Sequence, residues 1–334
     1  MAVTVRECYL FLLDNYHHNF VPPELPLDEN VDGALRFLEK NIEKCMKNAA
    51  ARPAVFKESS DMRKLFLEYR NRSIPFLEFA REIAMKRYEF KGRYEIFTSS
   101  DLFICVITNK EEEFLVGLEI NCKEEMVHHV VQNEIGIQNN LLVHQSVLPK
   151  VSLSNSSFFM IDMDKLNLTI LEGMTSSIDD DTFLYADKIL ECQTKISLKE
   201  AVRTAREVAE EVVEDHQLDK LHLIPAFERV IKETVNVGED LDMGVIAEEV
   251  FFEAPEARLA YVEQLKGHGI DKPVINQNLV KMPLRKTQRL VTDTGIEITI
   301  PLDYYNNKEF VEVVNGPDGR LSIQIKNIGN IENK

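Results

Sequence analysis

The sequence lacks the signatures of several large protein classes. Neither glycine-rich phosphate-binding loop, GxxxxGK[ST] or GxGxxG, occurs in its 334 residues, and the 13 glycines are spread through the chain. No apolar run approaches the roughly 18–20 residues that a membrane helix needs. The N-terminal stretch MAVTVRECYLFLLD has no small-residue cleavage site, so we do not expect a signal peptide. A P-loop, a Rossmann motif and a membrane span are therefore not predicted.

Cysteine is present without a pattern. The five cysteines form no CxxC motif, and they are Cys8, Cys45, Cys105, Cys122 and Cys192. An odd, scattered set is typical of buried free thiols in a reducing cytosol. We therefore expect these side chains to pack in the core, with no redox role.

Histidine and aspartate clusters offer little for a metal ion. Neighbouring residues of a strand point to opposite faces, so the pairs His17-His18 and His128-His129 are poorly placed to ligate one metal. The run Asp179-Asp180-Asp181 precedes a helix expected near Thr182, where acids favour the N-terminal dipole. No metal site and no cofactor is predicted.

A nuclease-like arrangement of acids is incomplete. Asp162 and Asp164 would share one face of a strand, but no third acid followed by a catalytic lysine appears at a suitable spacing. Glu119 is followed by Ile120 and Asn121, where a Glu-x-Lys motif needs lysine. We expect no catalytic residue, and a metal-dependent nuclease is the least favoured alternative.

Negative charge is concentrated in the middle of the chain. The formal net charge is −17. Residues 171–258 carry 22 acidic and 9 basic side chains, a net charge of −13, whereas residues 259–334 carry 9 acidic and 10 basic ones. The ends of this acidic protein can therefore still present local positive potential.

Hydrophobic periodicity predicts an α+β fold that begins with a sheet-and-helix module over residues 1–172. In some segments apolar residues alternate with polar ones, which predicts strands, and in others they recur at helical spacing, which predicts helices. Strands are expected at residues 4–13, 94–108, 114–120, 158–164 and 167–172, with more strand within 127–142, and helices at 31–47, 60–69 and from 73 onward. These strands are expected to form one antiparallel or mixed sheet with helices beside it.

An acidic helical module is predicted over residues 173–269. Ser197 and Glu200 have the spacing of a capping box, and the apolar stripe behind them lies opposite Glu207, Glu210, Glu211 and Glu214. Shorter helices are expected at residues 221–234, 242–250 and 255–266.

Residues 270–334 predict a small C-terminal antiparallel sheet. Ile296, Ile298 and Ile300 alternate with polar residues, as do Leu321, Ile323 and Ile325, and Val311 and Val313 flank Glu312. Asn315-Gly316-Pro317-Asp318-Gly319 lies between the last two runs and is suited to a hairpin turn.

Two basic stretches are candidate nucleic-acid contacts. Lys281, Arg285, Lys286 and Arg289 precede the C-terminal strands with no acid among them. Residues 52–93 contain eleven basic and six acidic side chains, including Arg63, Lys64, Arg70 and Arg72. Taken alone, the first stretch is better explained as charge that protects a strand edge, and the second as a solvated helix face.

The C-terminal stretch carries a family resemblance. A basic approach, then DTGIEITIP, an Asn/Asp-Gly turn and SIQIKNIGNI, is similar to the bacterial nucleoid-associated protein family of the YejK/NdpA type. Leu148-Pro149-Lys150-Val151 and Gly238-Glu239-Asp240-Leu241 fit the same family. The resemblance implies a non-enzymatic, cytoplasmic protein that associates with the nucleoid by binding DNA.

The hypothesis from the sequence is binding of double-stranded DNA without strong sequence specificity and without catalysis. Phosphate contacts from the basic stretches would supply such binding. The alternative is a protein–protein adaptor whose acidic helical middle is the contact surface and whose link to the nucleoid is indirect. A homo-oligomer is possible under both hypotheses, and no membrane partner is expected.

Overall fold

The computed structural model describes residues 3–28, 30–31, 33–134, 136–176, 181–274, 287–305, 307–315 and 320–330. The chain divides into two compact units, Met1–Lys195 and Ile196–Lys334. Mixed helices and antiparallel sheets confirm the predicted α+β class. The three modules expected from the sequence, with boundaries at 172 and 269, stay a prediction.

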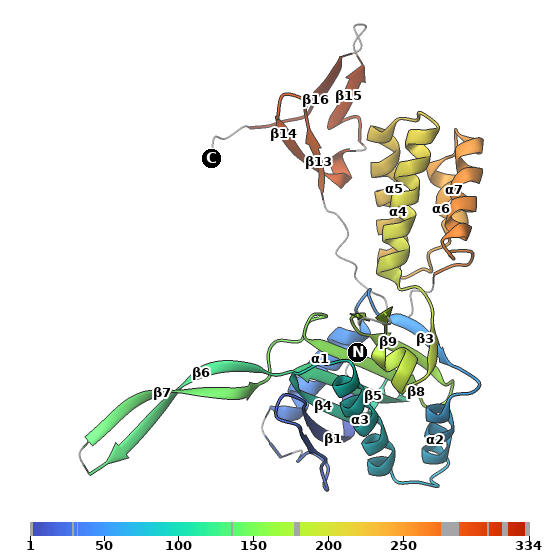
Figure 1. Cartoon of the computed structure of the whole chain (residues 1–334). Helices are drawn as coiled ribbons and strands as arrows, with labels where there is room; N and C mark the ends of the chain where they lie inside the picture. The colour runs from blue at the N-terminus through green and yellow to red at the C-terminus, as the bar shows by residue number, and fades with distance from the viewer. Residues whose placement is uncertain are drawn as a thin grey trace. The chain divides into compact units, whose positions relative to one another are not determined.

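The first unit is built on an eight-stranded antiparallel sheet (Figure 1). Its strand order is β12-β3-β9-β8-β5-β4-β1-β2. The strands are β1 (Thr4–Asp14), β2 (Asn19–Val21), β3 (Arg52–Phe56), β4 (Ser99–Asn109), β5 (Glu112–Asn121), β8 (Ser156–Asp162), β9 (Asn167–Leu171) and β12 (Cys192–Thr194). Through β12 the sheet includes residues that lie beyond the expected end of the first module.

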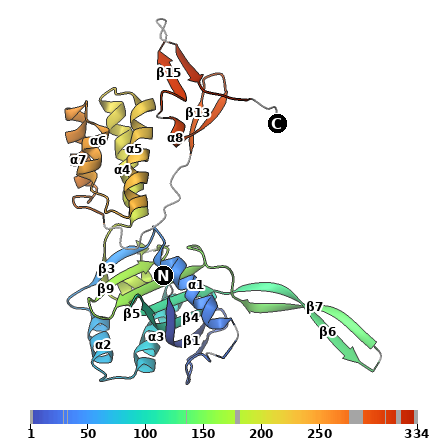
Figure 2. The same ribbon diagram turned by 180° about the vertical axis from the view of Figure 1, so that it is seen from behind.

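Helices cover both faces of this sheet, as the two opposite views show (Figures 1 and 2). The helices are α1 (Ala34–Met46), α2 (Asp61–Arg70), α3 (Phe76–Arg93) and the π-helix η1 (Leu184–Ile189). Leu102 and Ile104 of β4 lie in one core with α2, α3 and η1. Phe103 and Cys105, which point the opposite way, lie in a second core with α1. The central strands are therefore buried on both faces.

Residues 123–147 form a hairpin outside this sheet, contrary to the expectation that they extend it. β6 (Lys123–Asn133) and β7 (Gly136–Val147) form a two-stranded antiparallel sheet of their own, drawn in green in Figure 1. Strand-forming residues are visible there in the sequence, but period-2 alternation does not say which strand is the neighbour. The short strands β2, β3 and β12 were not predicted.

The second unit begins with four helices, α4 (Leu198–Asp215), α5 (Lys220–Val237), α6 (Met243–Val250) and α7 (Pro255–Gly267). The predicted capping box at the start of α4 is confirmed. The Ser197 hydroxyl accepts a hydrogen bond from the Glu200 N–H, and the Glu200 carboxylate accepts one from the Ser197 N–H, each at 3.2 Å. The predicted apolar stripe is buried, and Glu207, Glu211 and Glu214 are exposed.

The C-terminal strands form two small antiparallel sheets. β13 (Thr287–Val291) pairs with β14 (Glu297–Pro301), and β15 (Val311–Asn315) pairs with β16 (Leu321–Ile325). The short helix α8 (Leu302–Tyr305) joins them through a core of Ile300, Tyr305 and Val311. The predicted turn residues 316–319 lie outside the described residues. Among the helices that the structure describes, none has the length and apolar character needed to cross a lipid bilayer.

Candidate nucleic-acid interface

The first predicted basic cluster is described at only one of its positions. Lys281, Arg285 and Lys286 lie outside the described residues. Arg289 lies on β13 with an exposed side chain, and its Nη2 is 2.5 Å from Oε1 of Glu297 on the neighbouring strand β14. The cluster has no acid in its own stretch of sequence, but strand pairing brings one against Arg289.

The second predicted set lies on and just after α2. Lys64 is exposed and pairs with Asp61 at 2.7 Å, and the Arg70 Nη1 donates to the Met163 carbonyl at 3.3 Å. Arg63 and Arg70 are seven residues apart and share one side of the helix, whereas Lys64 is turned away by about 100°. Arg72 is exposed in the left-handed conformation after the helix, with φ of 60°. The structure therefore does not gather all four on one helical row.

The acids considered for a nuclease have structural partners. Asp162 Oδ1 accepts hydrogen bonds from the N–H groups of Asp164 and Lys165, at 2.9 and 2.8 Å, which caps the turn after β8. Within the described ranges, no three His, Cys, Asp or Glu side chains gather as a metal site. Asp179 and Asp180 lie outside those ranges. His128 and His129 point to opposite faces of β6, as expected from their spacing.

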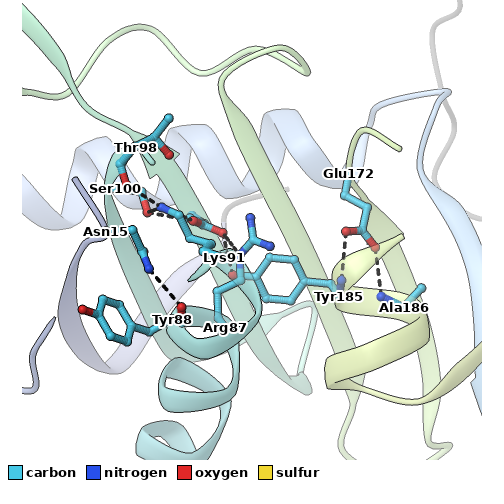
Figure 3. Close-up of polar contacts among 10 residues, drawn as sticks. Asn15, Arg87, Tyr88, Lys91, Thr98, Ser100, Glu172, Tyr185 and Ala186 are labelled. Atoms are coloured by element: carbon cyan, nitrogen blue, oxygen red, sulfur yellow. Dashed lines mark hydrogen bonds and ion pairs between the residues drawn. The ribbon is translucent and has the colours of Figure 1, made fainter. Parts of the chain in front are cut away.

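Glu119 belongs to a buried polar network. Figure 3 labels its partners Arg87, Lys91, Ser100 and Tyr185. One carboxylate oxygen accepts from Arg87 Nε at 2.6 Å and from the Tyr185 hydroxyl at 2.9 Å. The other accepts from the Ser100 hydroxyl at 2.7 Å and lies 3.6 Å from Lys91 Nζ. Lys91 also donates to Ser100 and to the Thr98 carbonyl. The network joins α3, β4, β5 and η1.

Two carboxyl groups around this network have strongly shifted pKa values. Burial alone would raise the pKa of Glu119, but Arg87, Lys91 and the hydrogen bonds outweigh it and lower that pKa to about 2. Burial raises the pKa of Glu172 to about 7, although its carboxylate accepts the N–H bonds of Tyr185 and Ala186. Perturbed groups of this kind often mark functional sites.

The charged side chains of this network are enclosed in the core, so we assign the network a structural role. The exposed fractions are 8% for Arg87, 0% for Lys91 and 2% for Glu119. The Arg87 guanidinium carbon also lies 4.9 Å from the centre of the Tyr185 ring. A phosphate or a substrate cannot reach these charges without displacing core residues, so the network holds α3 and η1 against the sheet.

A row of cations on α1 is the basic surface that the sequence analysis missed. Arg36, Lys40, Lys44 and Lys47 follow one another at intervals of four, four and three residues, and all four are exposed. At 3.6 residues per turn they fall within an arc of about 80° and span about 16 Å along the helix axis. We call these four residues the α1 cation row.

The acids of α1 are turned toward the start of β1. Glu39 Oε1 accepts from the Val5 N–H at 3.3 Å, and Glu43 Oε1 accepts from the Val3 N–H at 3.2 Å. The other oxygen of Glu43 lies 3.6 Å from Lys47. Both acids are partly buried beside the row, whereas its cations lie in solvent. The row therefore keeps a positive surface although α1 itself contains two glutamates.

The loop before β8 adds to this surface. Lys44 Nζ donates a hydrogen bond to the Val151 carbonyl. The preceding residue, Lys150, is exposed. On the opposite side of α1, Leu38, Ile42, Cys45 and Met46 are buried in the core beneath the sheet. The apolar stripe fixes the rotation of the helix, so its cations must face outward.

The signal for the α1 cation row was present in the sequence. The apolar spacing of residues 31–47 predicts this helix, and the same helical geometry applied to its charged residues places the four cations on the other side. What the sequence could not supply was the fate of Glu39 and Glu43. Their contacts with Val5 and Val3 join residues that are 34 and 40 positions apart.

Comparison with known proteins connects this geometry to a family. The family model described as nucleoid-associated protein YejK matches residues 13–333, which is nearly the whole chain. The match includes α1, both predicted basic stretches and the C-terminal sheets. No curated protein matches the chain.

The buried network predicts a large loss of stability on Glu119→Gln, because Arg87 and Lys91 would keep their charges without a carboxylate. At pH 7 the free energy of unfolding should fall by about 3–5 kcal/mol in urea titration. The folded-state pKa of Glu119 is depressed, so this stabilisation is present above its ordinary value of 4.5 and is lost as pH falls toward about 2. The difference between variant and wild type should shrink below pH 4.5.

Glu113→Gln is the matched control, since Glu113 lies on the same strand and is exposed. It should change stability by less than about 0.5 kcal/mol. If both variants unfolded like the wild type at pH 7, the network would not have the structural role assigned to it.

Proposed function

Since the chain belongs to the YejK family of nucleoid-associated proteins, we propose that it binds double-stranded DNA through the phosphate backbone, without strong sequence specificity and without catalysis. The nucleoid-associated role and the cytoplasmic location follow from the family. The mode of binding and the surface are proposed from the charges described above.

The observation that carries the proposal is the α1 cation row. The row offers four cations over about 16 Å, so it can contact up to about four phosphates of a duplex. Exposed lysine and arginine side chains on long stems can adjust to phosphates, and such contacts do not read bases. A helix anchored by a buried apolar stripe presents these cations on a rigid support.

The eight residues predicted from the sequence are proposed as additional contacts. Arg63 and Arg70 share one side of α2, and Arg289 projects from β13. The set comprises Lys281, Arg285, Lys286, Arg289, Arg63, Lys64, Arg70 and Arg72. Lys64 and Arg289 form ion pairs with Asp61 and Glu297 at 2.7 and 2.5 Å, closer than the 3.6 Å between Lys47 and Glu43. Because the described members of this set also do not form one row, we rank these residues below the α1 cation row.

A second candidate function is a protein–protein adaptor. The exposed glutamates of α4, Glu207, Glu211 and Glu214, form an acidic surface that would repel phosphates within a Debye length of about 8–10 Å. Such a surface is suited to a basic protein partner. Under this alternative the purified protein would not shift a naked duplex at any salt concentration.

The proposal predicts how neutral substitutions on α1 change DNA binding. If about four phosphates are contacted, log K should fall against log salt with a slope of about −3.6. Arg36→Gln, Lys40→Gln and Lys47→Gln together should reduce that slope by roughly 2.7 and weaken binding at least 10-fold for every duplex sequence alike. Fluorescence anisotropy with labelled duplexes at several salt concentrations measures both quantities.

The matched control removes three exposed cations from the helices of the second unit, with Lys199→Gln, Arg203→Gln and Lys266→Gln. It changes net charge equally and should leave the slope unchanged. A third variant, Arg285→Gln, Lys286→Gln and Arg289→Gln, tests the C-terminal cluster. Unchanged binding in the folded α1 variant, with loss in the third variant, would refute the assignment to α1. Absence of binding by wild type would favour the adaptor.

The non-catalytic part of the proposal predicts that supercoiled plasmid stays intact with the protein and Mg²⁺ or Mn²⁺. The reason is that Asp162 caps a turn and Glu119 is enclosed by its partners. Gel electrophoresis of the plasmid over time is the measurement. Nicking that is present in wild type and absent in Asp162→Ala protein would contradict the proposal and support a nuclease.

A further inference from the structure

The hairpin β6–β7 has an uncovered apolar face. Direct partners across an antiparallel pair point to the same side, and so does every second residue along each strand. The register pairs Met126 with Val143, His128 with Leu141, Val130 with Asn139, and Gln132 with Ile137. One face therefore carries five apolar side chains, which we call the hairpin stripe: Met126, Val130, Ile137, Leu141 and Val143.

These side chains are exposed to an unusual degree. The exposed fractions are 65% for Met126, 61% for Val130, 69% for Ile137, 63% for Leu141 and 47% for Val143. Apolar side chains exposed one by one are ordinary, but a contiguous apolar face marks an interaction surface. On the opposite face of the hairpin, Val127 and Val131 are half-buried and Leu142 is 50% exposed.

Stability of the hairpin also calls for a partner. β6 and β7 pair with each other and with no other strand among those described, and the views in Figures 1 and 2 show them apart from the eight-stranded sheet. A two-stranded sheet is marginally stable on its own in water, and a further layer against one face stabilises it. The two backbone edges of the hairpin likewise lack a neighbouring strand in the described part of the chain.

The charge of the hairpin narrows the choice of partner. From Met126 to Val147 the only side chain of Asp, Glu, Lys or Arg is Glu134, near the tip. Without a lysine or arginine this surface lacks the cations that neutralise DNA phosphates. Without a cluster of acids it offers nothing specific to a basic protein. A partner with the same uncharged, apolar character is required, and a second copy of the stripe has it.

We propose that the hairpin stripe packs against the same stripe of a second copy of this chain. In such a two-fold contact each copy uses the same residues. A two-fold axis running across the strands would set Val143 of one copy over Ile137 of the other, with Leu141 beside the axis. The two hairpins then form a small sandwich, with their sheets about 10 Å apart.

The size of the stripe sets the strength of this contact. Four paired rows cover about 20–25 Å along the strands at about 3.3 Å per residue, on a ribbon only two strands wide. The total buried area therefore falls below about 1,200 Å², the range of weak and reversible complexes. The dimer should form in a concentration-dependent way over the micromolar range. This inference does not depend on the proposed DNA binding.

Sedimentation velocity of the full chain, from about 1 to 200 μM, tests the proposal. Wild type should pass from one chain to two. Leu141→Glu places one charge from each copy inside the contact. It should therefore raise the dissociation constant at least about 100-fold. Leu142→Glu is the matched control, since it is the same substitution one residue away on the opposite face, and it should dimerise like wild type. Circular dichroism melts confirm that both variants are folded.

Three results would overturn the proposal. They are a monomer at every concentration, a dimer that persists in Leu141→Glu, and equal loss of the dimer in both variants. Measuring duplex binding by the wild type and both variants tests a further possibility, that the stripe contacts DNA. If Leu141→Glu weakened duplex binding while wild type stayed monomeric, the stripe would be a DNA contact and not a self-association surface.

Discussion

Burial of the central strands β4 and β5 on both faces is the constraint on which the first unit depends. Because helices must cover each face, α1 is fixed by its apolar stripe against one side, and α2, α3 and η1 are fixed against the other. A charged group on a central strand can then be accommodated only with partners, as Glu119 is by Arg87 and Lys91. The same constraint leaves one direction for the cations of α1, which is solvent. The hairpin leaves this sheet and so keeps an apolar face that nothing in the described part of the chain covers.

An acidic protein can bind DNA if its charges are separated in space. The net charge of −17 is largely a property of residues 171–258, and α4 exposes part of it. In α1 the separation is finer, since Glu39 and Glu43 accept hydrogen bonds from the N–H groups of Val5 and Val3 while the cations stay outside. Repulsion by the acidic surface would weaken nonspecific binding and make it less sensitive to salt, since salt screens this repulsion as well as the attraction at the row. Association with the nucleoid therefore needs either several contacts on one chain or more than one chain.

Much of the fold follows from local patterns, because the periodicities of β1, α1 and α4 are strong and the capping box at Ser197 is specific. Which strands pair with one another was harder to predict from the sequence. β3 and β12 are short strands without clear alternation. The strands of the hairpin look like strands of the main sheet in sequence, but they do not join it. The candidate site was limited in a similar way. Clusters such as Lys281 to Arg289 are visible as neighbours in sequence, whereas the α1 cation row appears only when residues are placed around a helix. The partners of Arg289, Glu39 and Glu119 come from other strands, and one sequence does not reveal them.

The central claim is that duplex DNA meets α1, and a lysine-acetylation footprint read by mass spectrometry tests it on the unmodified sequence. A brief pulse of acetylating reagent at low salt would report the reactivity of each lysine with and without a duplex. The account predicts that Lys40 and Lys47 lose reactivity when DNA is bound, while Lys199 and Lys266 of the second unit keep theirs. Full reactivity at Lys40 and Lys47 in a complex that protects Lys281 and Lys286 would contradict it.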